Sequence, residues 1–113
     1  MEGFEGVLYN KKLTALLVYP NAKTATEFVV PISVETVVSR AFSGNYYLKK
    51  LSIIENLKTI EADAFSSCSK LETLKILTDV EYIGDRAFRY CYRLQNVELN
   101  SGIGYIGKDV FQY

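Results

Sequence analysis

A dipeptide that recurs at a constant interval constrains the fold of this chain more than any other feature of the sequence. Ala41-Phe42, Ala64-Phe65, Ala87-Phe88 and Val110-Phe111 follow one another at steps of 23 residues. Other apolar columns keep the same step, and they begin at Phe28, Val30, Val34, Val37 and, with an alanine, Ala25. Such self-similarity predicts a repeat architecture, in which each unit buries its apolar side chains against its neighbours.

One such unit is too small to fold alone. It offers roughly six large apolar side chains, each worth about 1.5 to 3 kcal/mol when buried, whereas ordering costs about 1 to 2 kcal/mol per residue. The units must therefore stack, and a period of 23 falls in the range of leucine-rich repeats. We predict a leucine-rich repeat solenoid, β-rich and similar to the α/β horseshoe, that winds as a right-handed superhelix. About four repeats occupy residues 25–113, and the last is incomplete.

The strands are predicted from the alternation of apolar and polar residues in "LKKLSI", "LETLKI" and "LQNVEL", which span residues 48–53, 71–76 and 94–99. These strands should lie parallel on one face. The stretches "RAFSGN", "DAFSSC" and "RAFRYC" should form short turns or single helical turns on the other face, because Ser, Gly and Asn interrupt a longer helix.

Polar columns run beside the apolar ones. Asn45, Cys68 and Cys91 share a column at the end of each unit, where the inward-turning backbone needs a local hydrogen-bond partner. The cysteines are interpreted as buried thiols, and a disulfide between stacked coils remains an alternative. Charged columns, such as Arg40, Asp63, Arg86 and Asp109, alternate in sign and are interpreted as structural ladders between coils.

Composition excludes several functions. Thirteen basic and thirteen acidic residues give a net charge of zero, so the chain as a whole has no attraction to nucleic acid. No histidine is present to act as a general base or metal ligand, which predicts no enzyme activity, no metal and no cofactor. No apolar run is long enough to span a membrane. Nine tyrosines without a tryptophan fit either an interface or packing on the outside of a solenoid.

The pattern "V..I...AF..C..L..L.I" resembles the BspA-like, or TpLRR-type, leucine-rich repeat family over residues 25–113. The preceding "GVLYNKKLTALLVYP" resembles the hairpin module that caps the first coil in that family, which predicts an N-terminal β-hairpin cap over residues 1–24. The apolar flanks Val7 to Tyr9 and Leu13 to Tyr19 around "NKK" independently predict a hairpin.

The resemblance implies a non-enzymatic module of a surface or adhesion protein that binds a host or cell-surface protein. The alternatives are an intracellular scaffold of the same fold and an accessory binding region of a larger protein. The family implies a cell-surface or secreted location, but "MEGFEGVLYN" lacks a secretory signal, so a cytoplasmic location stays open.

Partner contact is predicted on the outward strand positions, because the exposed sheet of a solenoid is its usual docking surface. An alternative is that these positions form an unused, solvated face. A more apolar row, Pro31, Ile54 and Leu77, lies beside them. The candidate binding residues are Lys50, Ser52, Thr73, Lys75, Asn96 and Glu98.

The final coil stops at "VFQY" without a polar cap. We therefore expect a longer array, a covering partner, or self-association through this coil.

Overall fold

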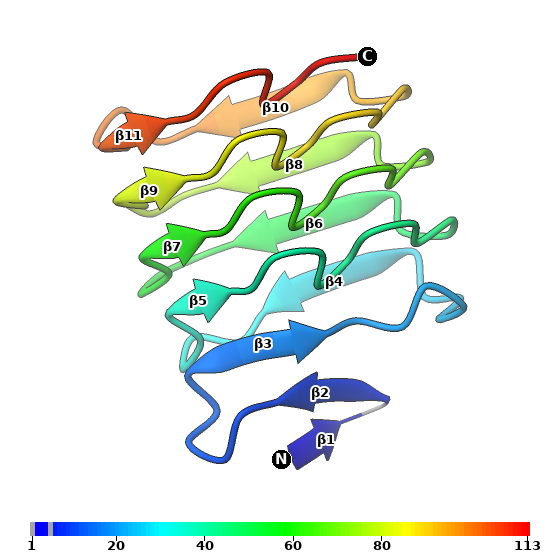
Figure 1. The fold of residues 1–113 in the computed structure, drawn as a ribbon, viewed down its shortest axis with the longest axis vertical. Helices are drawn as coiled ribbons and strands as arrows, with labels where there is room; N and C mark the ends of the chain where they lie inside the picture. The colour runs from blue at the N-terminus through cyan, green and yellow to red at the C-terminus, as the bar shows by residue number, and fades with distance from the viewer. Residues whose placement is uncertain (1, 5) are drawn as a thin grey trace.

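The computed structural model describes the backbone of residues 2–4 and all of residues 6–113, which form two sheets and, within those ranges, no helix (Figure 1). One sheet has four strands, β4 (Glu27–Val30), β6 (Lys50–Ile53), β8 (Thr73–Ile76) and β10 (Asn96–Leu99). The other has seven, β1 (Glu2–Phe4), β2 (Val7–Tyr9), β3 (Ala15–Val18), β5 (Thr36–Val37), β7 (Thr59–Ile60), β9 (Tyr82–Ile83) and β11 (Tyr105–Ile106). Each coil contributes one strand to each sheet, so the molecule is a β-solenoid of about four turns.

The four-stranded sheet confirms the predicted parallel strands. Its register is the sequence period, since Lys50 pairs with Thr73 and Thr73 pairs with Asn96. In β6 and β8 the inward side chains are fully buried and the outward ones are partly exposed. The alternation of apolar and polar residues in the sequence therefore sets which side of the sheet each residue occupies.

The second sheet was not predicted. The second residue of each of its four shortest strands belongs to the apolar column that starts at Val37, and Val37, Ile60 and Ile83 are buried. Each of β5, β7, β9 and β11 is only two residues long, which is too short to show an alternating pattern.

The stretches expected to form turns or single helical turns form turns only. Arg40, Asp63 and Arg86 have φ values of 64°, 61° and 59°. Four residues later in two of these coils, Ser67 and Tyr90 both have φ of 64°. A left-handed residue at each end of such a short segment prevents a helical turn from continuing, so the helical alternative is wrong for the described residues.

Adjacent coils lie close together beside the turn of the third coil. Gly84 is buried there, and a Cβ atom at this position would lie 2.5 Å from the backbone nitrogen of Ala62. Because that neighbour is backbone, it cannot move aside as a flexible side chain can. Glycine is therefore required at position 84 by the spacing of the coils.

The core contains a continuous stack of aromatic rings along the solenoid axis. Phe42 lies 4.4 Å from Phe65, and Phe65 lies 4.9 Å from Phe88, measured between ring centroids. All three side chains are buried. The stack continues to Tyr19 at 4.5 Å from Phe42 and to Phe111 at 5.7 Å from Phe88. The recurring phenylalanines thus share one interior environment, as the repeat predicts.

The N-terminal strands cover the first coil. β2 and β3 pair antiparallel, as a hairpin around "NKK" predicts, and β3 then pairs parallel with β5. The Asn10 side chain holds the turn, since its Oδ1 accepts hydrogen bonds from the amides of Thr14 and Ala15 at 2.8 and 2.9 Å. The division into a cap of residues 1–24 and repeats from residue 25 remains a prediction.

The Asn45 side chain forms hydrogen bonds with backbone groups of the turn at the end of its coil and of the preceding coil. Its Nδ2 donates to the carbonyl oxygens of Pro20 and Lys23 at 3.0 and 3.2 Å. Its Oδ1 accepts from the amides of Tyr47 and Leu48 at 2.9 and 2.8 Å. The side chain is fully buried, so these four bonds replace the water that it loses.

In the following coils, the two cysteines also donate hydrogen bonds to backbone carbonyl groups. Both are free and buried. Cys68 Sγ donates to the carbonyl oxygen of Phe42 at 3.2 Å, and Cys91 Sγ donates to that of Phe65 at 3.3 Å. This supports the interpretation of the column as a set of buried hydrogen-bond partners for the backbone.

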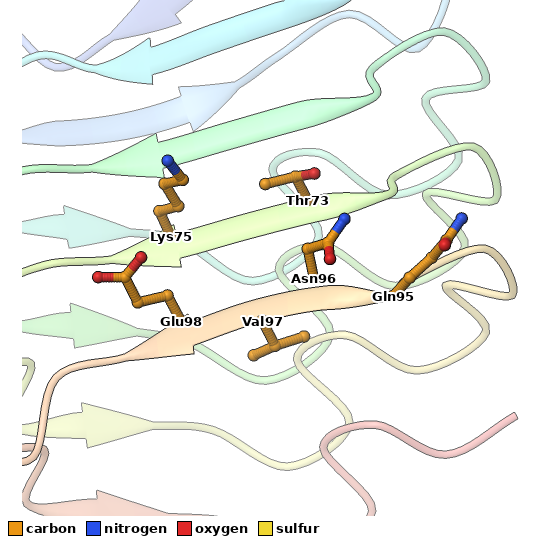
Figure 2. Close-up of a pocket in the computed structure, with 6 residues that line it drawn as sticks. All are labelled: Thr73, Lys75, Gln95, Asn96, Val97 and Glu98. Carbon is orange, nitrogen blue, oxygen red and sulfur yellow. The ribbon is translucent and has the colours of Figure 1, made fainter.

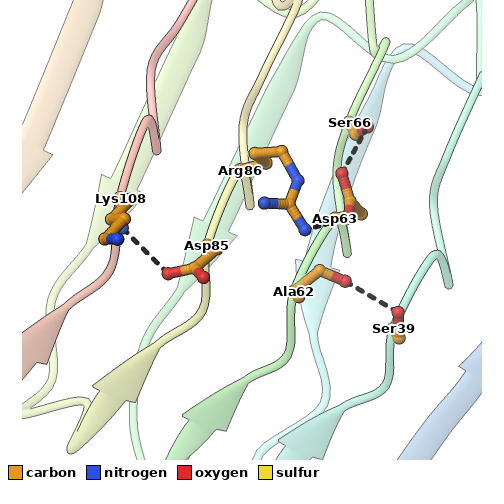
Figure 3. A network of polar contacts seen from close by, with 7 residues as sticks. All are labelled: Ser39, Ala62, Asp63, Ser66, Asp85, Arg86 and Lys108. Carbon is orange, nitrogen blue, oxygen red and sulfur yellow. Dashed lines mark hydrogen bonds and ion pairs between the residues drawn. The ribbon is translucent and has the colours of Figure 1, made fainter.

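Polar contacts also join neighbouring coils at the surface (Figure 3). Arg86 Nη2 lies 3.3 Å from Asp63 Oδ2, and the amide of Lys108 donates to Asp85 Oδ1 at 2.9 Å. The predicted charge ladder is therefore formed between two of its four members. Within the described ranges, Arg40 and Asp109 form no ion pair.

The last coil departs from the predicted burial. Val97 belongs to an inward column but is 43% exposed, whereas Leu74 at the same position one coil earlier is fully buried. Ile106 and Phe111 are 46% and 38% exposed. The reason is geometric, because β10 and β11 are the edge strands of their sheets and have a described neighbour on one side only.

Candidate binding face

The six residues predicted to contact a partner lie on the outward side of the four-stranded sheet, two on each of β6, β8 and β10. We call this surface the ladder face, and it consists of Lys50, Ser52, Thr73, Lys75, Asn96 and Glu98. The parallel register brings them into two rows across the strands, since Lys50, Thr73 and Asn96 are paired in turn, as are Ser52, Lys75 and Glu98.

Lys75 and Glu98 carry the opposite charges of the ladder face. They occupy directly paired positions on β8 and β10. No ion pair joins them in the part of the chain that the structure describes. Glu98 is exposed and Lys75 is partly exposed, so both charges can contact a partner without breaking an internal bond.

An open depression of about 360 Å³ lies between these two strands. Four of the six predicted residues line it, Thr73, Lys75, Asn96 and Glu98. Figure 2 shows their side chains projecting from β8 and β10, with Lys75 and Glu98 toward one end and Asn96 toward the other. The depression has amide, hydroxyl, ammonium and carboxylate groups within one small area.

Gln95 and Val97 also line this depression, and sequence reasoning did not include them. Val97 was assigned to the core because its column is apolar in every coil. Val97 is exposed at the sheet edge, and Figure 2 shows its side chain pointing away from β8, unlike those of Asn96 and Glu98. Gln95 precedes the strand, where the alternating pattern no longer indicates direction.

The more apolar row beside the ladder face is exposed as well. Ile54 and Leu77 are 46% and 45% exposed and follow β6 and β8 directly. Ile32, one position beyond Pro31, is 54% exposed. An apolar strip beside a polar one is the composition of an interface that has an apolar centre and a polar rim.

The chemistry of the cysteines fits a structural role. Burial raises the pKa of the Cys91 thiol from 9.0 to about 12, and burial raises the pKa of Cys68 further. Thiolates are the reactive form of cysteine, so both side chains stay protonated and inert near neutral pH. Across residues 2–4 and 6–113, no group of three or more His, Cys, Asp or Glu side chains is arranged to hold a metal ion.

The sequence matches the BspA type leucine rich repeat region over residues 18–113, in six copies. The chain belongs to this family. Leucine-rich repeat proteins of this kind are generally non-enzymatic binding modules, and this family is typically surface-associated in bacteria. No curated protein matches the sequence. In the described residues no helix is long and apolar enough to cross a membrane.

Similarity to one solved structure supports the fold. The crystal structure of the pneumococcal vaccine antigen PcpA is similar at a TM-score of 0.71 and 22% identity, over 93% of this chain and 33% of that one. A leucine-rich repeat protein from Eubacterium ventriosum ATCC 27560 matches at a TM-score of 0.45 and 23% identity, over 96% of this chain and 48% of that one. The chain thus spans about a third of PcpA, and that similarity shows a shared solenoid fold.

Proposed function

We propose that this chain is a non-enzymatic protein-binding module of a surface or adhesion protein, and that it contacts its partner through the ladder face. The observation that carries the proposal is the depression between β8 and β10, which brings ammonium, carboxylate, amide and hydroxyl groups into one small area. The exposed strip at Ile54 and Leu77 extends the same surface with apolar area. Family membership supports binding as the role, and the depression between β8 and β10 supports the choice of this surface.

The alternatives are an intracellular scaffold and an accessory binding region of a larger protein. The same surface would serve each of them, and the site chemistry does not distinguish them. Location does distinguish the first, and we propose the cell surface because the family is typically found there. Antibody labelling of intact cells tests this, since a surface protein is labelled without permeabilisation and an intracellular scaffold is not.

A pull-down with a triple variant tests the binding face. Lys50→Ala, Lys75→Ala and Glu98→Ala together remove three exposed or half-exposed charges without touching the core. The purified chain should capture a protein from host or cell-surface extracts, and the triple variant should lose that protein. A matched variant, Lys11→Ala, Lys58→Ala and Glu81→Ala, removes the same charges from exposed positions elsewhere and should retain it. Equal capture by both variants would contradict the assignment of the ladder face.

A second candidate role is self-association through the last coil. Val97, Ile106 and Phe111 belong to columns that are buried in earlier coils but are themselves 38 to 46% exposed. Contact with another copy would cover them. Light scattering should then show mass increasing with concentration, and a strict monomer at high concentration would count against the idea.

A further inference from the structure

A second exposed surface lies where each coil leaves its turn and approaches the four-stranded sheet. We call it the tyrosine edge, and it is made of Tyr46, Lys70, Tyr90, Tyr92, Arg93 and Tyr113. The tyrosines at positions 46, 92 and 113 are 57%, 60% and 71% exposed. None of these residues belongs to the ladder face.

The rings of the tyrosine edge are ordered by one another and by cations. Tyr90 and Tyr92 stack with centroids 5.9 Å apart, and Tyr92 and Tyr113 stack at 6.5 Å. Lys70 Nζ lies 4.8 Å from the centroid of the Tyr46 ring. The guanidinium carbon of Arg89, which lies beside the edge, is 4.4 Å from the centroid of the Tyr90 ring. These contacts hold the side chains in place before any partner binds, which lowers the entropy cost of binding.

The charges of the edge are all positive. The turn segments 64–71 and 87–94 contain Lys70, Arg89 and Arg93 and no aspartate or glutamate. The carboxylate nearest in sequence is that of Glu72, and it forms no ion pair with these cations. Within the described residues, the side chains of all three cations are without an ion-pair partner.

The placement of Lys70 and Arg93 differs from that of charges elsewhere in the solenoid. The two residues occupy the same position in consecutive coils, 23 residues apart. In other columns stacked charges are opposite in sign, as in the pair of Asp63 and Arg86. Two cations in one column, neither of them in an ion pair among the described residues, make the edge complementary to negative charge.

The orientation of the rings decides which anion fits. Tyr90 contacts Arg89 and Tyr92, and Tyr92 stacks with Tyr90 and Tyr113, so in these two rings the edges and hydroxyl groups are what remain for a partner. Aromatic edges are electropositive, and phenol hydroxyls donate hydrogen bonds. Single-stranded nucleic acid instead binds by stacking bases on free ring faces. Tyrosine and arginine are also the residues that dominate protein–protein contacts.

We propose that the tyrosine edge binds an acidic segment of a protein, with Lys70 and Arg93 pairing to its carboxylates and the tyrosine hydroxyls donating hydrogen bonds. This surface is independent of the ladder face. A protein partner could use either surface or both.

Fluorescence anisotropy with a labelled peptide rich in Asp and Glu tests the proposal on the full chain. The wild type should bind the peptide saturably at low salt and leave a Gly/Ser peptide of equal length unbound. Lys70→Gln with Arg93→Gln should weaken binding by about tenfold or more, because two charge-assisted contacts are lost. Lys70→Arg with Arg93→Lys keeps the charges and should retain binding. Tyr92→Phe removes one hydroxyl and should weaken binding about threefold.

A double variant of the ladder face provides the control. Lys50→Gln with Lys75→Gln changes the net charge by the same amount and should weaken binding by less than about twofold, because the distant charges are screened. The proposal is overturned by any of three results: no saturable binding by the wild type, equal weakening in the two glutamine variants, or tighter binding of heparin or single-stranded oligothymidylate than of the acidic peptide. Far-ultraviolet circular dichroism checks that each variant is folded.

Discussion

Replacing Phe65 by alanine tests how much of the stability comes from contacts between coils. The side chain is fully buried, and its ring lies between Phe42 at 4.4 Å and Phe88 at 4.9 Å. A buried aromatic side chain removes about 150 to 250 Å² from water, which corresponds to about 4 to 6 kcal/mol at 25 cal/mol per Å². Measured losses for Phe→Ala in cores are about 3 to 5 kcal/mol. We therefore expect Phe65→Ala to lower the free energy of unfolding by about 4 kcal/mol.

Phe111 provides a matched control in the same column. Its side chain is 38% exposed, and one ring neighbour lies 5.7 Å away. Because less area is buried and a ring contact is missing on one side, Phe111→Ala should lower the free energy of unfolding by about 2 kcal/mol. Urea unfolding followed by circular dichroism measures both losses. A difference between the two variants under about 0.5 kcal/mol, or a loss at Phe65 below about 1.5 kcal/mol, would refute the reasoning.

Three further predictions concern single positions. Burial raises the pKa of Cys91 from 9.0 to about 12 and raises that of Cys68 as well. The two thiols therefore contribute stability that is present below pH 9 and is lost as pH rises from 9 toward 12. In alkaline unfolding, a variant with both Cys68→Ala and Cys91→Ala should lack this pH-dependent loss of stability. Gly84→Ala should lower the free energy of unfolding by about 1 to 3 kcal/mol, because its Cβ atom would meet backbone atoms. Gly102→Ala should lower it by less, because its Cβ atom would meet a side chain that can move. Thermal unfolding measures both changes. Asn45→Ala should cost about 2 to 4 kcal/mol because it leaves buried backbone groups unpaired, and Asn45→Cys, which restores a weak donor, should cost less in the same assay.

The sequence was sufficient to predict the parts of the fold that follow from periodicity. Each coil repeats its apolar positions at one step, so the strands β6, β8 and β10, their parallel order and the phenylalanine stack could all be placed. The Asn45, Cys68 and Cys91 column could be interpreted because its members share hydrogen-bonding capacity rather than size. Residues that occupy the same environment in every coil recur at the same step in the sequence.

Other features leave no such signal. A two-residue strand such as Thr59–Ile60 cannot show alternation, so the second sheet went unpredicted. The left-handed conformations of Arg40, Asp63 and Arg86 occur at a column without glycine, so the sequence did not indicate that turns would form there in place of helical turns. Tyr19 occupies the phenylalanine column one coil before Phe42. The repeat pattern did not indicate this, because the residue is a tyrosine and lies in the predicted hairpin.

The sequence predicted which way the residues of the candidate site point, but not the shape of the depression that they line. Alternation in the strands indicated that Thr73, Lys75, Asn96 and Glu98 point outward, and they line the depression. The contribution of Val97 depends on β10 being an edge strand, which is a property of the assembled sheet and not of the local sequence. Whether a partner contacts these residues remains a prediction.

Amide hydrogen exchange on the intact chain tests the central claim that each coil is stabilised by the coils beside it. Because β6 and β8 have a paired strand on both sides and β10 has one on one side only, we expect the slowest exchange at Leu51 and Leu74 and faster exchange through Asn96–Leu99. Equal protection of β10 and β6 in the monomer would contradict it, since stability would then not depend on stacking.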